Sequence, residues 1–213
     1  MSNPEEDLEK MLLSTGIRVG TPVKTKFMSP FITKANPEGL YILDMNKALE
    51  RIDVAASFIS RITMSKVAIC SAREYGKTPV EKFCELTGAL PVLGRFMPGT
   101  FTNPLLPNYM EPELVFVTDP QADQQAVTEA TRAGLPVIAI SNSDNVTSKV
   151  DLVIPANNRG RRALATVYWL LAKAVLKKLK LVSPEEQAID KIVYREKEYK
   201  IDDFETKLVE EVV

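Results

Sequence analysis

Short apolar runs and apolar residues at helical spacing alternate along this chain of 213 residues. The runs are bounded by turn residues and predict buried strands at residues 39–44, 67–70, 89–92, 114–117, 137–140 and 152–154. The stretches between them predict helices over residues 45–62, 78–86, 120–133 and 160–181. This repeated order of strand and helix predicts a doubly wound α/β domain, in which helices cover both faces of a parallel sheet.

The two ends of the chain depart from this pattern. Residues 4–14 have acids near their start and Gly16 after their end, so they predict a helix. Residues 17–37 hold three prolines and no lasting period, which predicts an extended, irregular segment. Residues 184–213 are acidic and show no pattern that predicts an element. We therefore predict one α/β domain over residues 1–183, followed by an acidic C-terminal tail over the remaining residues.

The formal net charge of −1 hides an uneven distribution of charge. The tail holds ten acids and five bases, a net charge of −5, whereas residues 1–183 hold 22 bases and 18 acids, a net charge of +4. Two stretches, residues 17–37 and 152–183, carry bases but no acids. Because local fields decide contact with phosphates, both stretches are candidates for binding an anionic partner. Their bases are Arg18, Lys24, Lys26 and Lys34 in the first stretch, and Arg159, Arg161, Arg162, Lys173, Lys177, Lys178 and Lys180 in the second.

The composition argues against several classes of protein. There is no histidine, which removes the commonest general base and the commonest zinc ligand, so we expect no metal site and no cofactor. No uncharged apolar run approaches the ~20 residues that a membrane helix needs. Residues 1–10 are polar and acidic, unlike a signal peptide. We expect a soluble, cytoplasmic protein in which Cys70 and Cys84 are buried, reduced thiols.

Residues 73–78 follow a predicted strand and contain the second half of a P-loop. The full pattern needs a glycine five residues before the pair Gly76-Lys77, where this chain has Ser71. We therefore do not expect nucleotide binding at this loop. The helix start can still bind an RNA phosphate, with Arg73 and Lys77 beside it.

Two further polar loops follow predicted strands, and each allows two interpretations. Asp119 is a candidate catalytic or metal-binding carboxylate; alternatively it turns the chain, Pro120 starts the next helix and Asp123 complements the helix dipole. We favour the turn, because the sequence shows no obvious basic partner for Asp119 and no histidine to complete a triad. The loop at residues 141–145 resembles a sugar-phosphate loop in a general way, and turn chemistry explains it equally well.

Residues 157–162 follow the last predicted strand and open the longest helix. Arg159, Arg161 and Arg162 stand beside the free amides of a helix start, an arrangement that suits phosphate recognition. The alternative is a solvated basic helix start. We favour phosphate contact, because positive charge at a helix N-terminus opposes the macrodipole and indicates an anionic partner.

Four segments in order resemble the S-two family of small-subunit ribosomal proteins. They are GRFMPGTFTNP at residues 94–104, EPELVFVTDP at 111–120, GLPVIAI at 134–140 and PANNRG at 155–160. The resemblance covers roughly residues 8–179. It implies a flavodoxin-like parallel sheet, in agreement with the periodicity. Residues 45–62 have room for one ordinary helix and not for the long helical hairpin of the bacterial branch, so the resemblance implies an archaeal or eukaryotic form. The short tail, without the long eukaryotic extension, favours the archaeal type.

The resemblance implies a structural role without catalysis. The chain would be a constituent of the small ribosomal subunit that binds small-subunit ribosomal RNA and neighbouring ribosomal proteins, with no small-molecule substrate and no membrane contact. One departure is Arg18, which stands where the family usually has histidine, two residues before the glycine that corresponds to Gly20. The role of the loop at residues 94–112 in binding RNA or protein stays open. The candidate RNA-binding residues are Arg18, Lys24, Lys26, Lys34, Arg73, Lys77, Arg95, Arg159, Arg161 and Arg162.

Two other functions are alternatives. One is a doubly wound enzyme or sensor for a phosphorylated sugar or nucleotide, which would use the loops that begin at Thr118 and Ser141. Thermal-shift screening with such ligands distinguishes it from a ribosomal protein. The other is a protein-interaction module in which the acidic tail docks a partner.

Overall fold

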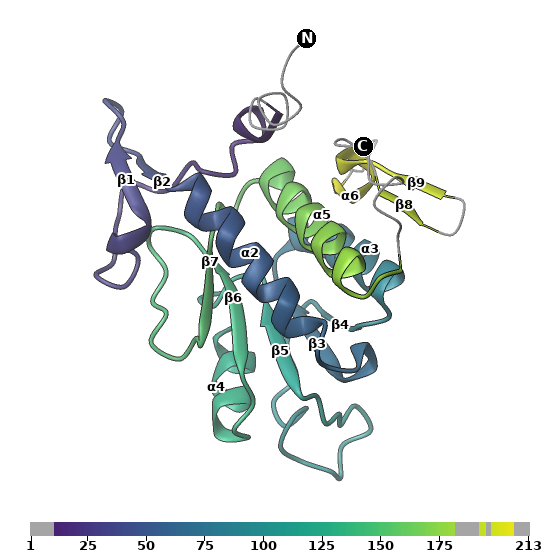
Figure 1. The fold of residues 1–213 in the computed structure, drawn as a ribbon. Helices are drawn as coiled ribbons and strands as arrows, with labels where there is room; N and C mark the ends of the chain where they lie inside the picture. The colour runs from purple at the N-terminus through teal and green to yellow at the C-terminus, as the bar shows by residue number, and fades with distance from the viewer. Residues whose placement is uncertain (1–10, 182–191, 195–196, 207–213) are drawn as a thin grey trace, which may run out of the picture.

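A five-stranded parallel sheet forms the centre of the computed structural model, which describes residues 11–181, 192–194 and 197–206 (Figure 1). Its strands are β3 (Val67–Ser71), β4 (Leu90–Leu93), β5 (Leu114–Val117), β6 (Val137–Ser141) and β7 (Leu152–Pro155). They lie in the order β4-β3-β5-β6-β7, and all neighbours are parallel. Numbered from β3, this is the 2-1-3-4-5 order of flavodoxin-like folds, which confirms the predicted fold class.

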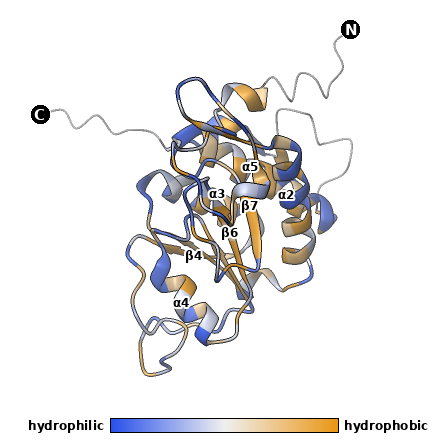
Figure 2. Cartoon of the chain, turned by 90° about the vertical axis from the view of Figure 1, so that its left-hand side faces the viewer, coloured by the Kyte–Doolittle hydropathy of each residue, from blue (hydrophilic) through white to orange (hydrophobic). Residues whose placement is uncertain are grey.

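Helices cover both faces of the sheet, as the hydrophobic pattern predicted. The helices α2 (Met45–Ile59), α3 (Lys77–Thr87) and α5 (Arg161–Lys178) share one core cluster with strand residues such as Phe116. The helix α4 (Gln124–Arg132) shares a second cluster with the alternate strand residues, such as Val117. Figure 2 shows the apolar strands β6 and β7 with α4 on the opposite side from α2 and α5. Successive side chains along a strand point to opposite faces of the sheet, so each strand contributes to both core clusters.

The helix α5 runs through the larger core cluster. Tyr168 and Trp169 are fully buried, and the Tyr168 hydroxyl lies 2.7 Å from the Thr118 hydroxyl at the end of β5. The indole of Trp169 packs in the core and donates to the carbonyl of Tyr199 at 3.3 Å. Both cysteines are buried and free, as expected. Among the described helices, none combines the length and the apolar character that crossing a bilayer requires.

The N-terminal region forms a small sheet apart from the central one. The strand β2 (Tyr41–Leu43) lies where residues 39–44 predicted a strand, but it pairs antiparallel with β1 (Ile32–Ala35). Within the extended segment, β1 was not predicted, because its residues are half-buried or exposed and show no apolar run. Residues 11–14 are helical, and the rest of the helix predicted at residues 4–14 lies outside the described residues. Within the described residues, three 3-10 turns complete the connections: Ser29–Phe31, Met64–Lys66 and Glu74–Gly76.

The start predicted for the helix after β5 was wrong, because α4 begins at Gln124 and not at Pro120. The Asp119 carboxylate accepts a hydrogen bond from the amide of Gln121 at 2.9 Å and holds the chain in a turn. Asp123 stands at the N-cap position, but its side chain does not cap the helix. It accepts from the amide of Ala72 at 2.9 Å, in the loop after β3.

The described part of the acidic tail packs against the domain, which no sequence pattern predicted. The strands β8 (Ile192–Tyr194) and β9 (Lys197–Tyr199) pair antiparallel, and α6 (Ile201–Phe204) follows. Buried side chains from all three elements, among them Phe204, join the core cluster of α3 and α5. Widely spaced apolar residues among many charges gave no periodicity to detect. The division of the chain at residue 183 stays a prediction.

The contribution of the tail to stability is testable at Phe204, which is fully buried. Truncation of a buried phenylalanine removes apolar contacts and leaves a cavity, so Phe204→Ala should lower the free energy of unfolding by about 3–5 kcal/mol. Leu105→Ala is the matched control, because Leu105 is 90% exposed and its truncation should change stability by about 0.5 kcal/mol or less. Urea denaturation measures both. Equal stability of the two variants would show that the tail does not support the core.

Candidate nucleic-acid interface

The first part of the basic segment, which we define as residues 17–37, lies across the carboxyl edge of the sheet. Open α/β folds bind ligands at this edge. The amide of Asn157, after β7, donates to the carbonyl of Ile17 at 2.8 Å. The amide of Thr25 donates to the carbonyl of Ser143, after β6, at 2.9 Å. These bonds fix residues 17–25 along the ends of two neighbouring strands.

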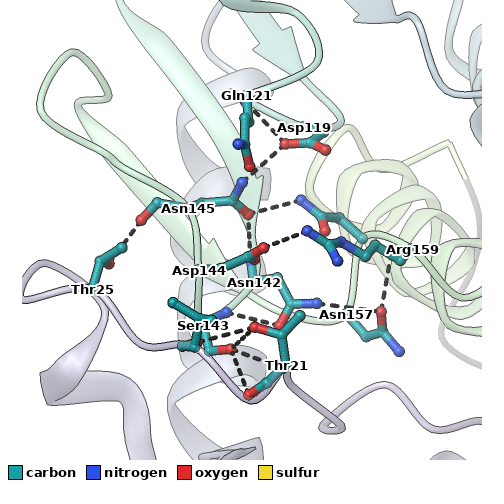
Figure 3. A network of polar contacts seen from close by, with 12 residues as sticks. Thr21, Thr25, Asp119, Gln121, Asn142, Ser143, Asp144, Asn145, Asn157 and Arg159 are labelled. Atoms are coloured by element: carbon teal, nitrogen blue, oxygen red, sulfur yellow. Dashed lines mark hydrogen bonds and ion pairs between the residues drawn. The ribbon is translucent and has the colours of Figure 1, made fainter.

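Close packing at Gly20 and Ser143 holds the middle of this segment. The amide of Gly20 donates to the carbonyl of Tyr41 at 2.7 Å, and a Cβ atom on Gly20 would lie only 2.6 Å from that oxygen. The next residue, Thr21, bonds Ser143 twice, through its amide and its hydroxyl, each at 2.9 Å (Figure 3). Only glycine fits at position 20, because the backbone passes between Tyr41 and Ser143.

A buried network of amide side chains supports the loop after β6. Asn145 is 1% exposed, and its side chain joins the Asn142 amide at 2.6 Å, the Asn158 side chain at 3.0 Å and the Asp119 carboxylate at 3.0 Å. The backbone carbonyl of Asn145 accepts a hydrogen bond from the Thr25 hydroxyl at 2.8 Å (Figure 3). The side chains of Asn142, Ser143 and Asn145 thus bind other groups of the same chain, which supports turn chemistry over the sugar-phosphate interpretation.

The topological switch point, between β3 and β5, is occupied by an ion pair. The guanidinium of Arg73 contacts the Asp119 carboxylate, with 2.7 Å between Nε and Oδ2. The expectation that Asp119 lacks a basic partner was therefore wrong. The two residues are 46 positions apart, and only the adjacency of β3 and β5 brings them together. Arg73 is half-buried, and this carboxylate already engages its charge.

The backbone of the half P-loop packs closely against Ser71. The backbone at Gly76 lies so close to the side chain of Ser71 that a Cβ atom would collide with the Ser71 hydroxyl. Lys77, which the sequence placed beside this helix start, forms an ion pair with Glu74 at 2.8 Å. A nucleotide site at this loop therefore finds no support in the geometry.

Asp123 is a buried carboxyl group beside the switch point. It is 2% exposed, and its Oδ2 atom has no hydrogen-bond partner within the described residues. Burial raises the pKa of Asp123 from 3.8 to about 7; the nearby Asp119 also raises it, whereas the hydrogen bond from the amide of Ala72 lowers it. Charge on this group is unfavourable in the folded protein.

The three arginines at the start of α5 have acidic partners within the chain. Arg159 forms an ion pair with Asp144. The carboxylate of Glu205, at the end of the described tail, lies 2.7 Å from Nε of Arg161 and 3.4 Å from Nε of Arg162. A carboxylate near a helix N-terminus interacts favourably with the macrodipole, so Glu205 offsets the cost of the two cations. No local sequence pattern indicates this contact, because Glu205 lies 43 residues after Arg162.

The remaining candidates are more available to a partner. Within residues 17–37, the side chains of Lys24, Lys26 and Lys34 are exposed, and that of Arg18 is half-buried. Among the described residues, none of these four side chains forms an ion pair. Lys24 lies 5.2 Å from the centre of the Tyr41 ring, a cation–π contact that involves no carboxylate.

Arg95 is also exposed, but it follows β4, at the edge of the sheet opposite β7. The structure therefore does not bring it to the basic segment. No group of three or more acidic, cysteine or histidine side chains in the described part of the chain is placed to hold a metal ion.

Comparison with known proteins finds one family along most of the chain. The family model described as Ribosomal protein S2 matches residues 107–178. The small ribosomal subunit protein uS2 of Nitrosopumilus maritimus (strain SCM1) is 57% identical over 208 residues, which are 97% of this chain and 96% of the relative. The protein of the same name from Cenarchaeum symbiosum (strain A) is 50% identical over 97% of this chain and 95% of its own. The protein of the same name from Thermofilum pendens (strain DSM 2475 / Hrk 5) is 55% identical over 79% of this chain and 78% of its own length.

The raised pKa of Asp123 predicts a pH dependence of stability. Because the folded state favours the protonated carboxyl, its contribution is fully present below pH 3.8 and is lost as the pH rises through about 7. The unfolding free energy of the wild type should therefore fall between pH 4 and pH 8. In Asp123→Asn this fall should be smaller by up to about 4 kcal/mol, because the amide does not ionise. Chemical denaturation across this range measures the change, with the exposed Glu38→Gln variant as control. Parallel pH profiles of wild type and Asp123→Asn would contradict the assignment.

Proposed function

Because this chain belongs to the ribosomal protein S2 family, we propose that it serves as a structural constituent of the small ribosomal subunit. Relatives that carry the name small ribosomal subunit protein uS2 are 50% and 57% identical over 97% of its length. The three relatives named above come from archaea, in agreement with the archaeal-type form that the family resemblance implied. We place the protein in the cytoplasm, in contact with ribosomal RNA and neighbouring ribosomal proteins.

The basic segment at residues 17–37 is the proposed RNA anchor. It carries four bases and no acids, and three of its lysines are exposed. Phosphate contacts are the main sequence-independent source of affinity for nucleic acids, and they need cations that are not already neutralised. The observation that carries the proposal is the fixed path of this segment, which bonds to the loop after β6 at Thr21 and Thr25. The backbone that carries Lys24 and Lys26 is therefore fixed before RNA binds.

The arginines at the start of α5 are proposed as secondary contacts. Arg159 would have to leave Asp144, and Arg161 and Arg162 would have to share their charge with Glu205 or release it. Each of these arginines would break an ion pair before it binds a phosphate, so its net gain is smaller than that of a cation without an acidic partner. We therefore expect these arginines to contribute less to RNA affinity than the exposed lysines of the segment.

We propose that the protein is not an enzyme. The flavodoxin-like order would place a ligand beyond the ends of β3 and β5, and that position holds the ion pair of Arg73 and Asp119. The neighbouring loop at Gly76 is closed against Ser71. These contacts favour a ribosomal role over the enzyme or sensor for a phosphorylated sugar or nucleotide.

Sedimentation tests the subunit assignment directly. The protein should migrate with small ribosomal subunits in a sucrose gradient at low salt. Recovery of the protein only at the top of the gradient would contradict the proposal.

The location of the anchor predicts different effects for two sets of substitutions. Replacing Lys24, Lys26 and Lys34 with alanine should weaken binding to small-subunit ribosomal RNA and make the slope of log K against log salt shallower by about 2–3, since each lost phosphate contact contributes about 0.7–0.9. Replacing Arg159, Arg161 and Arg162 should change that slope less. Filter binding at several salt concentrations measures both, with thermal unfolding as the control for folding. A larger loss for the arginine variant would move the anchor to α5.

A further inference from the structure

An exposed aromatic side chain lies within the basic segment. Phe27 is 51% exposed, and Lys24 and Lys26 beside it are exposed as well. Val23, 60% exposed, extends the apolar surface by one more side chain. Single exposed apolar residues are common in proteins, so exposure alone does not indicate a contact. The combination of an exposed aromatic ring with two exposed cations that have no acidic partner among the described residues needs a further explanation.

The turn that carries Phe27 is anchored on both sides. Thr25 is fixed by its amide to the carbonyl of Ser143 at 2.9 Å and by its hydroxyl to the carbonyl of Asn145 at 2.8 Å. Met28, directly after Phe27, is fully buried, and its amide donates to the Thr25 hydroxyl at 3.3 Å. The exposed ring is therefore presented from a supported turn, because both of its flanks are held to the domain.

We propose that Phe27 stacks on an unpaired base of RNA while Lys24 and Lys26 contact the adjacent phosphates. Sites for single-stranded nucleic acid combine an aromatic platform with a basic track, because every base has a stacking face and every nucleotide has a phosphate. A continuous double helix hides its base faces, so the partner is a loop, bulge or strand end. This inference rests on the proposed function and names the class of RNA that the segment contacts.

A protein neighbour is the less favoured occupant. The cores of protein interfaces are depleted of lysine and enriched in apolar residues, whereas here two lysines lie within three positions of the aromatic ring. The absence of any acid from residues 17–37 also suits a uniformly anionic partner better than a protein surface of mixed charge.

Fluorescence distinguishes stacking from charge contact. The one tryptophan of the chain, Trp169, is fully buried and gives a constant background. The emission of F27W should be quenched by a single-stranded 12-nucleotide oligoadenylate probe and not by a blunt RNA duplex of the same length. V54W is the matched control, because Val54 is 50% exposed on α2, beside the carboxylate of Asp53. Quenching of both variants alike would overturn the proposal.

Affinity for the same probe gives a second, independent readout. F27A and F27L should each bind the single strand about tenfold more weakly than the wild type, since leucine keeps apolar area but cannot stack. Unchanged binding by F27L would reject stacking while leaving the phosphate anchor in place. Failure of the wild type to bind either RNA would reject the anchor and the inference together. Quenching of F27W by RNA-free small-subunit proteins and not by the oligonucleotide would identify a protein contact and overturn the inference.

Discussion

The hydrogen bonds of Ser143 and Asn145 determine where the basic segment of this protein lies. Both residues are almost fully buried in the loop after β6, and buried polar groups must find partners or lose stability. Their partners include the backbone and hydroxyl groups of Thr21 and Thr25. The N-terminal segment therefore satisfies the loop, and the loop in turn holds the segment across the carboxyl edge of the sheet.

At the carboxyl edge of the sheet, side chains of the chain itself occupy the position at which related folds bind a ligand. Parallel strands deliver loops to a common edge, and in flavodoxin-like folds those loops surround a ligand. Here Arg73 and Asp119 pair across the switch point, and Asp123 reaches back to the loop after β3. The chain's own side chains make the contacts that a bound phosphate would make elsewhere. What remains exposed is the outer surface of the basic segment, which suits a large anionic partner.

Much of the fold could be predicted from the sequence, because core elements depend on local periodicity. The central strands and the helices α2 and α5 lie where the apolar pattern placed them, within a few residues at each end. The misses involve contacts between distant residues. Asp119 finds Arg73 only through strand adjacency, and Glu205 reaches the start of α5 only through a tail whose apolar anchors are spread among charges. The candidate site was thus predicted as a set of cations, while the carboxylates that neutralise half of them emerged from the tertiary structure.

The central claim is that residues 17–37 anchor a structural protein of the small subunit to ribosomal RNA. A cryo-electron-microscopy map of the small subunit containing this chain tests it most directly. The account predicts the α/β domain within the particle, with the carboxyl edge of its sheet facing RNA and the segment 17–37 in contact with the phosphate backbone. A map in which that segment faces solvent, or contacts protein alone, would contradict it.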